Sequence, residues 1–317
     1  MDQMRVLHIN NIANVAKIMR DAQRKLGVMA EVTAVKWRYS GEIDHPIPPN
    51  PKLLANVKLF IWILRNIGKY DVVHYHGKPG ITAIYYSVKR CPTILHFHGS
   101  EIRNARSVPF VSFAKRTFVS TPDLVEPAKK LDLPEVEYLP NPVPMHDLSP
   151  VEIGRRGEEV KSGRTPNLVH LPTNRSVKGT DNLLQAIEIL REMGIDVNLD
   201  IVEHVGPKEA LERMKNADIV VDWVSPKYRI YGLVSIQAMA LSIPVICHID
   251  PAIYPEKPPI QTVDATPEGI AKGIKHLIES AESWGEIGKR EREFALKTHD
   301  SLKIAKKLKA VYEEIAE

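Results

Sequence analysis

The sequence predicts an α/β protein made of two doubly wound domains. Short apolar runs alternate with helical segments along the whole chain, a proline-rich turn (PNPVP, 140–144) interrupts the alternation, and the alternation then begins again. Apolar strands joined by helical crossovers are typical of a parallel sheet that is covered by helices on both faces. A length of 317 residues suits two such domains of ordinary size.

The expected elements follow in order along the chain. In the first half, strands are expected at 5–10, 30–35, 70–76, 92–99, 116–121 and 136–140, with helices ending near 26 and spanning about 52–67. In the second half, strands are expected at 167–171, 197–202, 218–224 and 244–249, with helices at 180–193, 207–216, from 232 and over 267–316. We therefore place an N-terminal domain at 1–150 and a second domain at 151–298, followed by a C-terminal helix at 299–317. The polar stretch after the proline turn is expected to be a linker.

Composition excludes several classes of protein. Hydrophobic residues make up 44% and charged residues 26%, as in globular domains that dissolve in water. The two cysteines, Cys91 and Cys247, match no metal or redox spacing, so we expect a reducing compartment and no disulfide framework. Arg5 and Lys17 interrupt any apolar run of a signal peptide, and no segment has the roughly 18 apolar residues of a membrane span. A cytoplasmic location is expected.

Positive charge is concentrated in the first half of the chain. Residues 1–150 contain 20 Lys and Arg against 13 Asp and Glu, a net charge of +7, whereas the remainder contains 23 against 26, a net charge of −3. An anionic partner or an ordinary solvated surface would each explain the difference, and the absence of contiguous basic blocks favours the second. The helix at 52–67, with Phe60 and Trp62, could lie peripherally on the inner face of a membrane. Its apolar residues run nearly all round, which favours burial.

Two segments of the second half have the pattern of a diphosphate-binding site. Arg175 and Lys178 stand just before an amphipathic helix, and Gly232 opens a later, strongly apolar helix. Cations and helix N-termini directed at one crevice are how an α/β domain holds a diphosphate, and a glycine allows the backbone to approach it closely. The simpler explanations are a surface ion pair and an ordinary glycine at the start of a helix.

The same residues resemble glycosyltransferases of family 4, which have the GT-B fold. The resemblance rests on the PN-x-V turn, the R-x-x-K-G element and the G-L-x-x-x-x-A-M-A helix, and it is strongest over 167–248. It implies two Rossmann-like domains that face a central cleft and close about the proline turn, with the last helix crossing back to the first domain. It also implies transfer of a sugar from a nucleotide donor with retention, without a metal or other cofactor.

The resemblance assigns roles to residues of the second domain. Arg175 and Lys178 would neutralise the leaving diphosphate, the amides at Gly232 and Leu233 would hold phosphate, and Gln237 would hold the ribose. The chain departs from the family where two glutamates are expected, since Arg229 and Gln237 stand there. Glutamine still hydrogen-bonds a ribose diol, whereas Arg229 would suit an acidic sugar or a phosphate.

The aromatic residues beside Arg229 are further candidates. Tyr228 and Tyr231 flank the arginine and could stack on a base or a sugar.

In the first domain, His98 and Glu101 follow a strand, where the family's acceptor-side histidine contacts the donor sugar. Asn11 and Asn14 replace the family's glycine-rich loop and would contact ligand or cap a helix.

The pairs His74-x-His76 and His96-x-His98 each place two imidazoles on one strand face. A metal site is the less favoured explanation, because no acidic or cysteine ligand lies at short spacing.

The sequence therefore predicts a retaining, hexosyltransferase-type glycosyltransferase with a nucleotide-sugar as substrate. The expected acceptor is a glycan, a lipid-linked molecule or a small molecule, and no nucleic acid is expected. Two alternatives remain open. The first is a catalytically silent binding protein or partner subunit, favoured by Arg229 and Gln237. The second is a nucleotide-sugar epimerase or hydrolase, for which Glu101 and Glu203 are the only acidic candidates.

Overall fold

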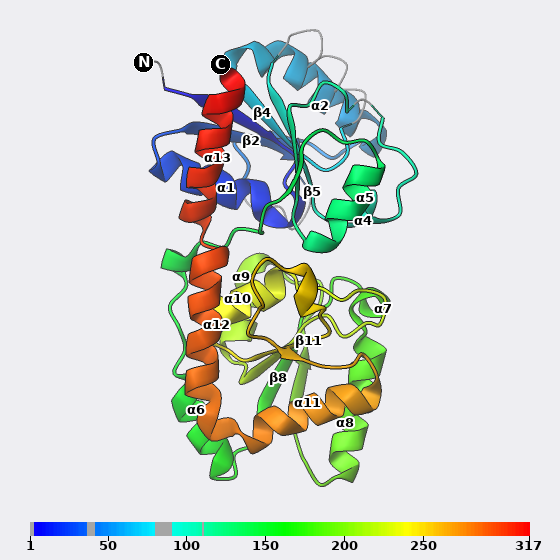
Figure 1. The fold of residues 1–317 in the computed structure, drawn as a ribbon, viewed down its shortest axis with the longest axis vertical. Helices are drawn as coiled ribbons and strands as arrows, with labels where there is room; N and C mark the ends of the chain where they lie inside the picture. The colour runs from blue at the N-terminus through cyan, green and yellow to red at the C-terminus, as the bar shows by residue number, and fades with distance from the viewer. Residues whose placement is uncertain (1–2, 37–41, 80–90, 110) are drawn as a thin grey trace. The chain divides into compact units, whose positions relative to one another are not determined.

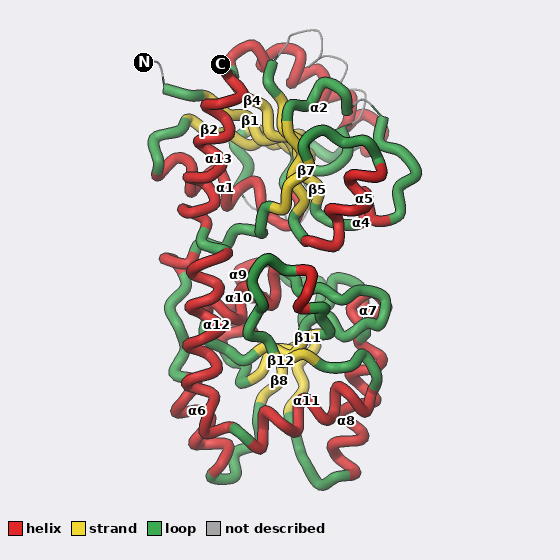
Figure 2. The backbone as a smooth tube through the Cα atoms, in the orientation of Figure 1, coloured by secondary structure: helices red, strands yellow, loops and turns green. Residues whose placement is uncertain are grey.

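The computed structural model describes residues 3–36, 42–79, 91–109 and 111–317. The chain divides into two compact units: unit 1 comprises Met1–Pro144 and Asp300–Glu317, and unit 2 comprises Met145–His299. Figure 1 follows the chain through both units by colour. Each unit combines a parallel sheet with helices, which confirms the α/β class (Figure 2).

Unit 1 contains a seven-stranded sheet in the order β3-β2-β1-β4-β5-β6-β7, and all its neighbouring strands are parallel. The strands are β1 (Arg5–Ile9), β2 (Met29–Val35), β3 (His45–Ile47), β4 (Val72–His76), β5 (Thr93–Phe97), β6 (Arg116–Val119) and β7 (Val136–Tyr138). The helices are α1 (Val15–Lys25), α2 (Lys52–Asn66), α4 (Ser100–Arg103), α5 (Val125–Lys130) and α13 (Ser301–Ala316). The strand order is that of a Rossmann-type sheet.

The two faces of the unit-1 sheet differ in chemistry, because successive side chains of a strand point to opposite faces. One face is apolar and shares a core with α2; its members include Leu7, Ile9, Val73, Tyr75, Leu95 and Phe97. The alternate positions carry the histidines His8, His74 and His96, which are fully buried. That second face is covered by α1 and by α13, which lie side by side (Figure 1).

Unit 2 contains a five-stranded parallel sheet in the order β12-β11-β10-β8-β9. The strands are β8 (Asn167–His170), β9 (Asn198–Ile201), β10 (Ile219–Val221), β11 (Val245–Cys247) and β12 (Gln261–Thr262). The helices are α6 (Ile153–Lys161), α7 (Arg175–Lys178), α8 (Thr180–Glu192), α9 (Pro207–Lys215), α10 (Leu233–Ala240), α11 (Pro267–Glu279) and α12 (Trp284–Thr298). Its core gathers Leu168, Ile219 and Ile246 from the strands with Trp284 from α12.

Three expectations about local structure were wrong. The stretch expected to be a linker contains α6, because Ile153, Gly157 and Val160 form one buried stripe among its charged residues. The strand expected at 218–224 ends at Val221. The helical region expected over 267–316 is interrupted before α12 and again before α13, where Asp300 caps the last helix by accepting hydrogen bonds from two of its amides.

Helix α2 is not buried all round, contrary to expectation. Leu54, Val57 and Ile61 form an exposed stripe, with 46%, 48% and 40% of their surface accessible. The apolar residues form two stripes on different sides of the helix, and only the stripe that includes Ile63 reaches the sheet. No helix in the described residues combines the length and apolar character needed to cross a membrane.

Gly157→Ala is expected to lower the free energy of unfolding of unit 2. A Cβ at Gly157 would lie 2.0 Å from the carbonyl oxygen of Ala281, so α6 would have to move away from its neighbour. Such overpacking costs about 1–3 kcal/mol. Gly154→Ala in the same helix is the matched control, because the nearest atom to its Cβ would be 3.5 Å away. Chemical denaturation measures both variants, and equal midpoints would contradict the packing argument.

Candidate functional site

The expected donor-binding residues of unit 2 follow the carboxyl ends of β8 and β10. Helix α7, which comes after β8, carries Arg175 and Lys178, and the Asn174 side chain caps it by accepting a hydrogen bond from the Val177 amide at 3.2 Å. Helix α10, which comes after β10, begins just past Gly232. Ligands of doubly wound sheets bind at this edge, so the structure places these residues where a site is expected.

Gly179 allows α7 to lie against the segment that follows β10. Its φ is +82°, and a Cβ there would lie 2.5 Å from the carbonyl carbon and oxygen of Val224. Glycine adopts this conformation readily and leaves room for the neighbouring backbone. The Lys178 carbonyl then accepts a hydrogen bond from the Val224 amide at 3.0 Å. This close approach brings the Lys178 side chain to the end of β10.

Asp222, the first residue after β10, connects the two candidate segments. Its Oδ1 accepts a hydrogen bond from Lys178 Nζ at 2.5 Å. Its Oδ2 accepts from Ser235 Oγ at 2.6 Å, from the Ser235 amide at 3.2 Å and from the Gly232 amide at 3.3 Å. The start of α10, where a donor phosphate was expected, therefore already binds a carboxylate of the chain itself.

The charge on Asp222 is stabilised by these partners. Burial alone would raise its pKa, but the charge and hydrogen bond of Lys178, with the hydrogen bond from Ser235, hold the pKa below its ordinary value. Sequence reasoning missed both Asp222 and Ser235. The available signals were an acidic residue directly after an apolar strand and a serine in the first turn of the next helix.

Two amides at the start of α10 remain available. The N–H groups of Leu233 and Val234 form no hydrogen bond with any residue that the structure describes. The first turn of a helix leaves its amides without partners inside the helix, and Asp222 takes only those of Gly232 and Ser235. A phosphate at this helix end would therefore bind at Leu233 and Val234.

The other two expected cations are also paired with acidic residues. Arg175 forms an ion pair with Glu203 at 2.5 Å, and Arg229 forms one with Asp250 at 3.4 Å. The hydrogen bond from Arg175 lowers the pKa of Glu203. All three cations proposed to bind the donor thus have an internal counter-charge.

The Lys178 side chain is much more deeply buried than the side chains of the two arginines. The Lys178 side chain is 6% exposed and that of Asp222 is 1% exposed, whereas the Arg175 side chain is 51% exposed and that of Arg229 is 57% exposed. Exposed ion pairs contribute little to stability, so either arginine can exchange its acid for a ligand at small cost. Removing Lys178 from Asp222 would leave a buried carboxylate without its counter-charge, which is strongly destabilising.

The position of the Trp223 side chain explains why residue 232 is a glycine. Its ring lies under Lys178, with Nζ 4.0 Å from the ring centroid, and a Cβ at Gly232 would lie 2.8 Å from Trp223 Nε1. That buried indole N–H has no hydrogen-bond partner among the described residues. Gly232 therefore makes room for a side chain of the same unit, which is a different reason from the close approach of a phosphate.

The remaining donor-side candidates differ in availability. Tyr231 is 3% exposed, stacks on Tyr254 at 4.7 Å between ring centroids, and its hydroxyl lies 2.9 Å from His299 Nε2. Its ring is a core element and not a surface for a base. Tyr228 packs edge-on against Trp223. Gln237, on α10, is half-buried, and its side chain forms no hydrogen bond with the described residues.

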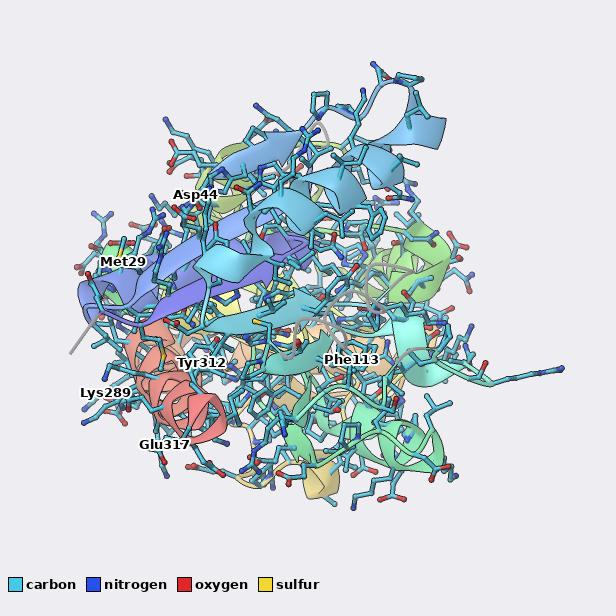
Figure 3. The ribbon with its side chains drawn as sticks, turned by 90° about the horizontal axis from the view of Figure 1, so that it is seen from above. Met29, Asp44, Phe113, Lys289, Tyr312 and Glu317 are labelled. Carbon is cyan, nitrogen blue, oxygen red and sulfur yellow. The ribbon has the colours of Figure 1, made fainter. Side chains whose placement is uncertain are left out.

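In unit 1, His98 belongs to a closed circuit of hydrogen bonds on the polar face of the sheet. The distances in the circuit lie between 2.7 and 3.3 Å. In order, its members are Gln23, Tyr312, His74, His96, Ser120, His98, His76 and His8, which returns to Gln23. Figure 3 labels Tyr312 on α13, beside the sheet. We call these eight side chains the histidine circuit.

Both ring nitrogens of His98 are used within the histidine circuit. Nδ1 lies 2.7 Å from Ser120 Oγ, and Nε2 lies 3.0 Å from His76 Nδ1. Burial lowers the pKa of His98 to about 3. Glu101 accepts a hydrogen bond from the His98 backbone amide at 3.1 Å, so it fixes the backbone and not the imidazole.

Asn11 and Asn14 form a local cap at the start of α1. Asn11 Oδ1 accepts a hydrogen bond from the Lys17 amide at 3.1 Å, and Asn11 Nδ2 donates to Asn14 Oδ1 at 3.1 Å. Asn14 itself has the left-handed backbone conformation, with a φ of +61°. The Asn11 side chain therefore caps the helix, whereas Asn14, at the N-cap position, makes no side-chain cap hydrogen bond of its own.

Histidines of the circuit could also be considered as metal ligands. Two groups have ligand atoms close together: His8, His74 and His76, and His76, His96 and His98. The ring nitrogens of these residues already form hydrogen bonds with one another or with Gln23, Ser120 and Tyr312. The hydrogen-bonding capacity of the cluster is therefore satisfied by the protein alone.

Comparison with known proteins shows the fold. No protein-family model matches the sequence, and no curated protein matches it. Sucrose-phosphate synthase from Thermosynechococcus elongatus is similar in structure, with a TM-score of 0.74, 13% identity and coverage of 99% of both chains. HepE from Anabaena, in complex with UDP and glucose, has a TM-score of 0.70, 13% identity and coverage of 98% of this chain and 100% of its own.

UDP-GlcNAc 2-epimerase from Neisseria meningitidis, bound to UDP-GlcNAc, is also similar. Its TM-score is 0.60 at 13% identity, and the match covers 98% of this chain and 100% of the epimerase. Transferases and epimerases thus share this architecture. The chain has the GT-B fold, with two Rossmann-like units, as expected from its sequence.

Lys178→Met is expected to destabilise unit 2 by about 3–5 kcal/mol, because it leaves the buried Asp222 carboxylate without its partner. Arg175→Ala is expected to leave the free energy of unfolding nearly unchanged, since its ion pair is exposed. Lys215→Met, which removes an exposed pair with Glu212, is the control for loss of a lysine. Urea denaturation measures the three variants. A Lys178→Met protein as stable as the parent would show that the pair is not structural.

Acid is expected to unfold unit 1 before unit 2. Burial lowers the pKa of His8 to about 4 and lowers the pKa values of His74, His76 and His96 well below the ordinary value. The unfolded chain therefore binds more protons below about pH 6.5, and stability falls as pH falls through that value. At pH 5.5 a histidine that stays neutral in the folded protein costs about 1.4 kcal/mol of stability. Among the described residues, burial lowers the pKa of five histidines in unit 1, His98 included, and of one in unit 2, His170.

Hydrogen exchange followed by mass spectrometry at pH 7.5 and 5.5 measures this effect separately in each unit. Peptides from β4 and β5 should lose protection at the lower pH, after correction for the intrinsic exchange rate. Peptides from β10 and β11, which contain no histidine, serve as the internal control. Equal loss of protection in both units would contradict the assignment of acid sensitivity to the histidine circuit.

Proposed function

We propose that this chain is a glycosyltransferase that binds a nucleoside-diphosphate sugar on unit 2 and transfers the sugar to an acceptor. The observation that carries the proposal is the arrangement at the carboxyl edge of the unit-2 sheet. There, the exposed guanidinium of Arg175 follows β8, and the available amides of Leu233 and Val234 open α10. The similarity in fold to HepE, whose structure contains UDP and glucose, supports a donor of this class.

In this proposal, Arg175 exchanges Glu203 for the donor diphosphate. A guanidinium can bind two oxygens of a phosphate at once, as it can bind the two oxygens of a carboxylate. The ion pair that must break, Arg175–Glu203, is exposed. As the bond between sugar and diphosphate breaks, negative charge builds on the leaving group. Arg175 stabilises that charge, and the amides of Leu233 and Val234 add two fixed donors. The proposal needs no metal ion for this step.

Lys178 has a positioning role in this proposal. It remains bound to Asp222, which in turn holds the Gly232 and Ser235 amides. The buried pair thereby fixes the first turn of α10 and presents the next two amides. This differs from the role expected from sequence, in which Lys178 contacts the diphosphate directly. Retention at the anomeric carbon and a hexose donor remain parts of the proposal that rest on the resemblance.

Two other functions compete with this one. A catalytically silent binding protein is favoured by the internal pairing of Arg175, Lys178 and Arg229 and by Gln237 at a position where the family has glutamate. An epimerase or hydrolase is favoured by the similarity to UDP-GlcNAc 2-epimerase. That function needs carboxyl groups for acid–base chemistry, and its candidate acids Glu101 and Glu203 are each bound to other groups of the chain.

Thermal unfolding with UDP, GDP, ADP and their sugars tests donor binding. One nucleotide-sugar should stabilise the parent protein, by about 2.7 kcal/mol at 100 times its dissociation constant. Arg175→Ala should lose this stabilisation. Arg213→Ala is the matched control, because Arg213 is similarly exposed and forms a comparable ion pair with Asp200. Equal stabilisation of the Arg175→Ala protein would contradict the proposed role of Arg175.

Product analysis with the donor so identified separates the three functions. A glycosylated product that appears only with an acceptor from a panel of glycans, lipid-linked sugars and small molecules supports the transferase. Free sugar or an epimer formed without acceptor supports the epimerase or hydrolase. Donor binding without any product across the panel supports the silent protein.

A further inference from the structure

The histidine circuit constrains the position of every proton within it. A neutral imidazole has one nitrogen that donates and one that accepts, and a hydroxyl donates one hydrogen. A closed circuit of such groups is satisfied only when every donor points in the same direction round it. A single reversed imidazole would place two N–H groups face to face on one side and two lone pairs face to face on the other.

The Gln23 amide sets the direction. Its Oε1 faces His8 Nε2 at 2.8 Å, and its Nε2 faces the Tyr312 hydroxyl at 3.0 Å. His8 must therefore donate from Nε2, and Tyr312 must accept from Gln23. The Tyr312 hydroxyl is then left to donate its hydrogen to His74 Nδ1, at 2.7 Å. The first and last histidines of the circuit thus both carry their proton on Nε2.

The same direction continues through the middle of the circuit. His74 Nε2 donates to His96 Nδ1, and His96 Nε2 donates to Ser120 Oγ. Ser120 donates to His98 Nδ1, and His98 Nε2 donates to His76 Nδ1. His76 Nε2 then donates to His8 Nδ1, which closes the circuit. All five histidines are therefore the same tautomer, and all are neutral.

We infer that the histidine circuit is one cooperative unit in which Tyr312 and Gln23, on α13 and α1, are positioning residues that fix the tautomer of His98. The inference rests on the proposed function only where it gives His98 a part in sugar transfer. With its lone pair on Nδ1 bound by Ser120, His98 is a neutral hydrogen-bonding group and not a general base. Its state follows from the Gln23 amide on α1, three hydrogen bonds away through His8 and His76. The Tyr312 hydroxyl on α13 couples that amide to His74 and so to the other side of the circuit.

Long-range ¹H–¹⁵N spectra of protein labelled at histidine read the tautomer of each ring at pH 7. In the parent protein, the five histidines of the circuit should all show the proton on Nε2. Tyr312→Phe removes one hydroxyl, which leaves His74 Nδ1 without its donor and Gln23 without its acceptor. In the parent protein the Gln23 amide can turn over only if His74 and His96 reverse as well, because the Tyr312 hydroxyl connects them. Without that hydroxyl the amide turns over independently, so His98 should change from one tautomer to a mixture of both.

Tyr70→Phe is the matched control, because it removes a tyrosine hydroxyl of unit 1 that is bonded to Glu31 and lies outside the circuit. His98 should keep its tautomer in that variant. Ser120→Ala provides a second opening of the circuit and should affect His74 as Tyr312→Phe affects His98. The experiment uses no donor, so its outcome is independent of whether the proposed transfer activity is correct.

Three results would overturn the inference. The first is a parent protein in which the five histidines differ in tautomer. The second is a folded Tyr312→Phe protein in which the His98 signals do not move. The third is a change in the parent spectra on treatment with EDTA, reversed by Zn²⁺, which would replace the hydrogen-bonded circuit by a metal centre at His76, His96 and His98.

Discussion

Unit 2 depends on one buried ion pair. Asp222 and Lys178 join the end of β10, helix α7 and the first turn of α10, and both side chains are almost fully buried. A phosphate would bind the same kinds of groups as this carboxylate, a lysine ammonium and the amides at the start of a helix. The most deeply buried acceptor at this edge of the sheet is therefore a carboxylate of the chain itself. Under the proposed function, the groups left for an anionic ligand are the exposed Arg175 and the amides of Leu233 and Val234, which are unpaired among the described residues.

In unit 1, the buried polar side chains of the histidine circuit are paired with one another without any charged group. Its polar side chains also gather on parallel strands, but they are imidazoles, a hydroxyl, an amide and a phenol, each of which both donates and accepts. A charged pair is held by attraction and tolerates changes in direction. In a circuit of neutral groups, every donor must face an acceptor, so the orientation of each member depends on that of all the others. The two units therefore differ in what disturbs them: loss of a partner in unit 2, and addition of a proton in unit 1.

The fold could be predicted from the sequence because its signals are local. Alternating apolar strands and helical segments define both sheets, and the proline turn marks the change between them. The elements that were missed have signals that depend on tertiary contacts. Helix α6 has only three buried positions among charged residues, and its apolar stripe becomes meaningful only when Trp284, more than a hundred residues later, packs against it. The strand expected to reach Val224 ends at Val221, and the next residue, Asp222, binds Lys178, which is distant in sequence.

The candidate donor residues could be named from the sequence, but the residues that pair with them could not. Arg175, Lys178 and Gly232 are found by local motifs, whereas their partners are distant: Glu203 lies 28 residues from Arg175, and Asp222 lies 44 from Lys178. One hydrogen bond of the histidine circuit joins Gln23 and Tyr312, which are 289 residues apart in sequence. Whether a cation can bind a ligand depends on how deeply its own counter-charge is buried, and that quantity exists only in the folded chain. A motif therefore indicates where an anion would bind, while burial of the acidic partner decides which of its cations is able to bind it.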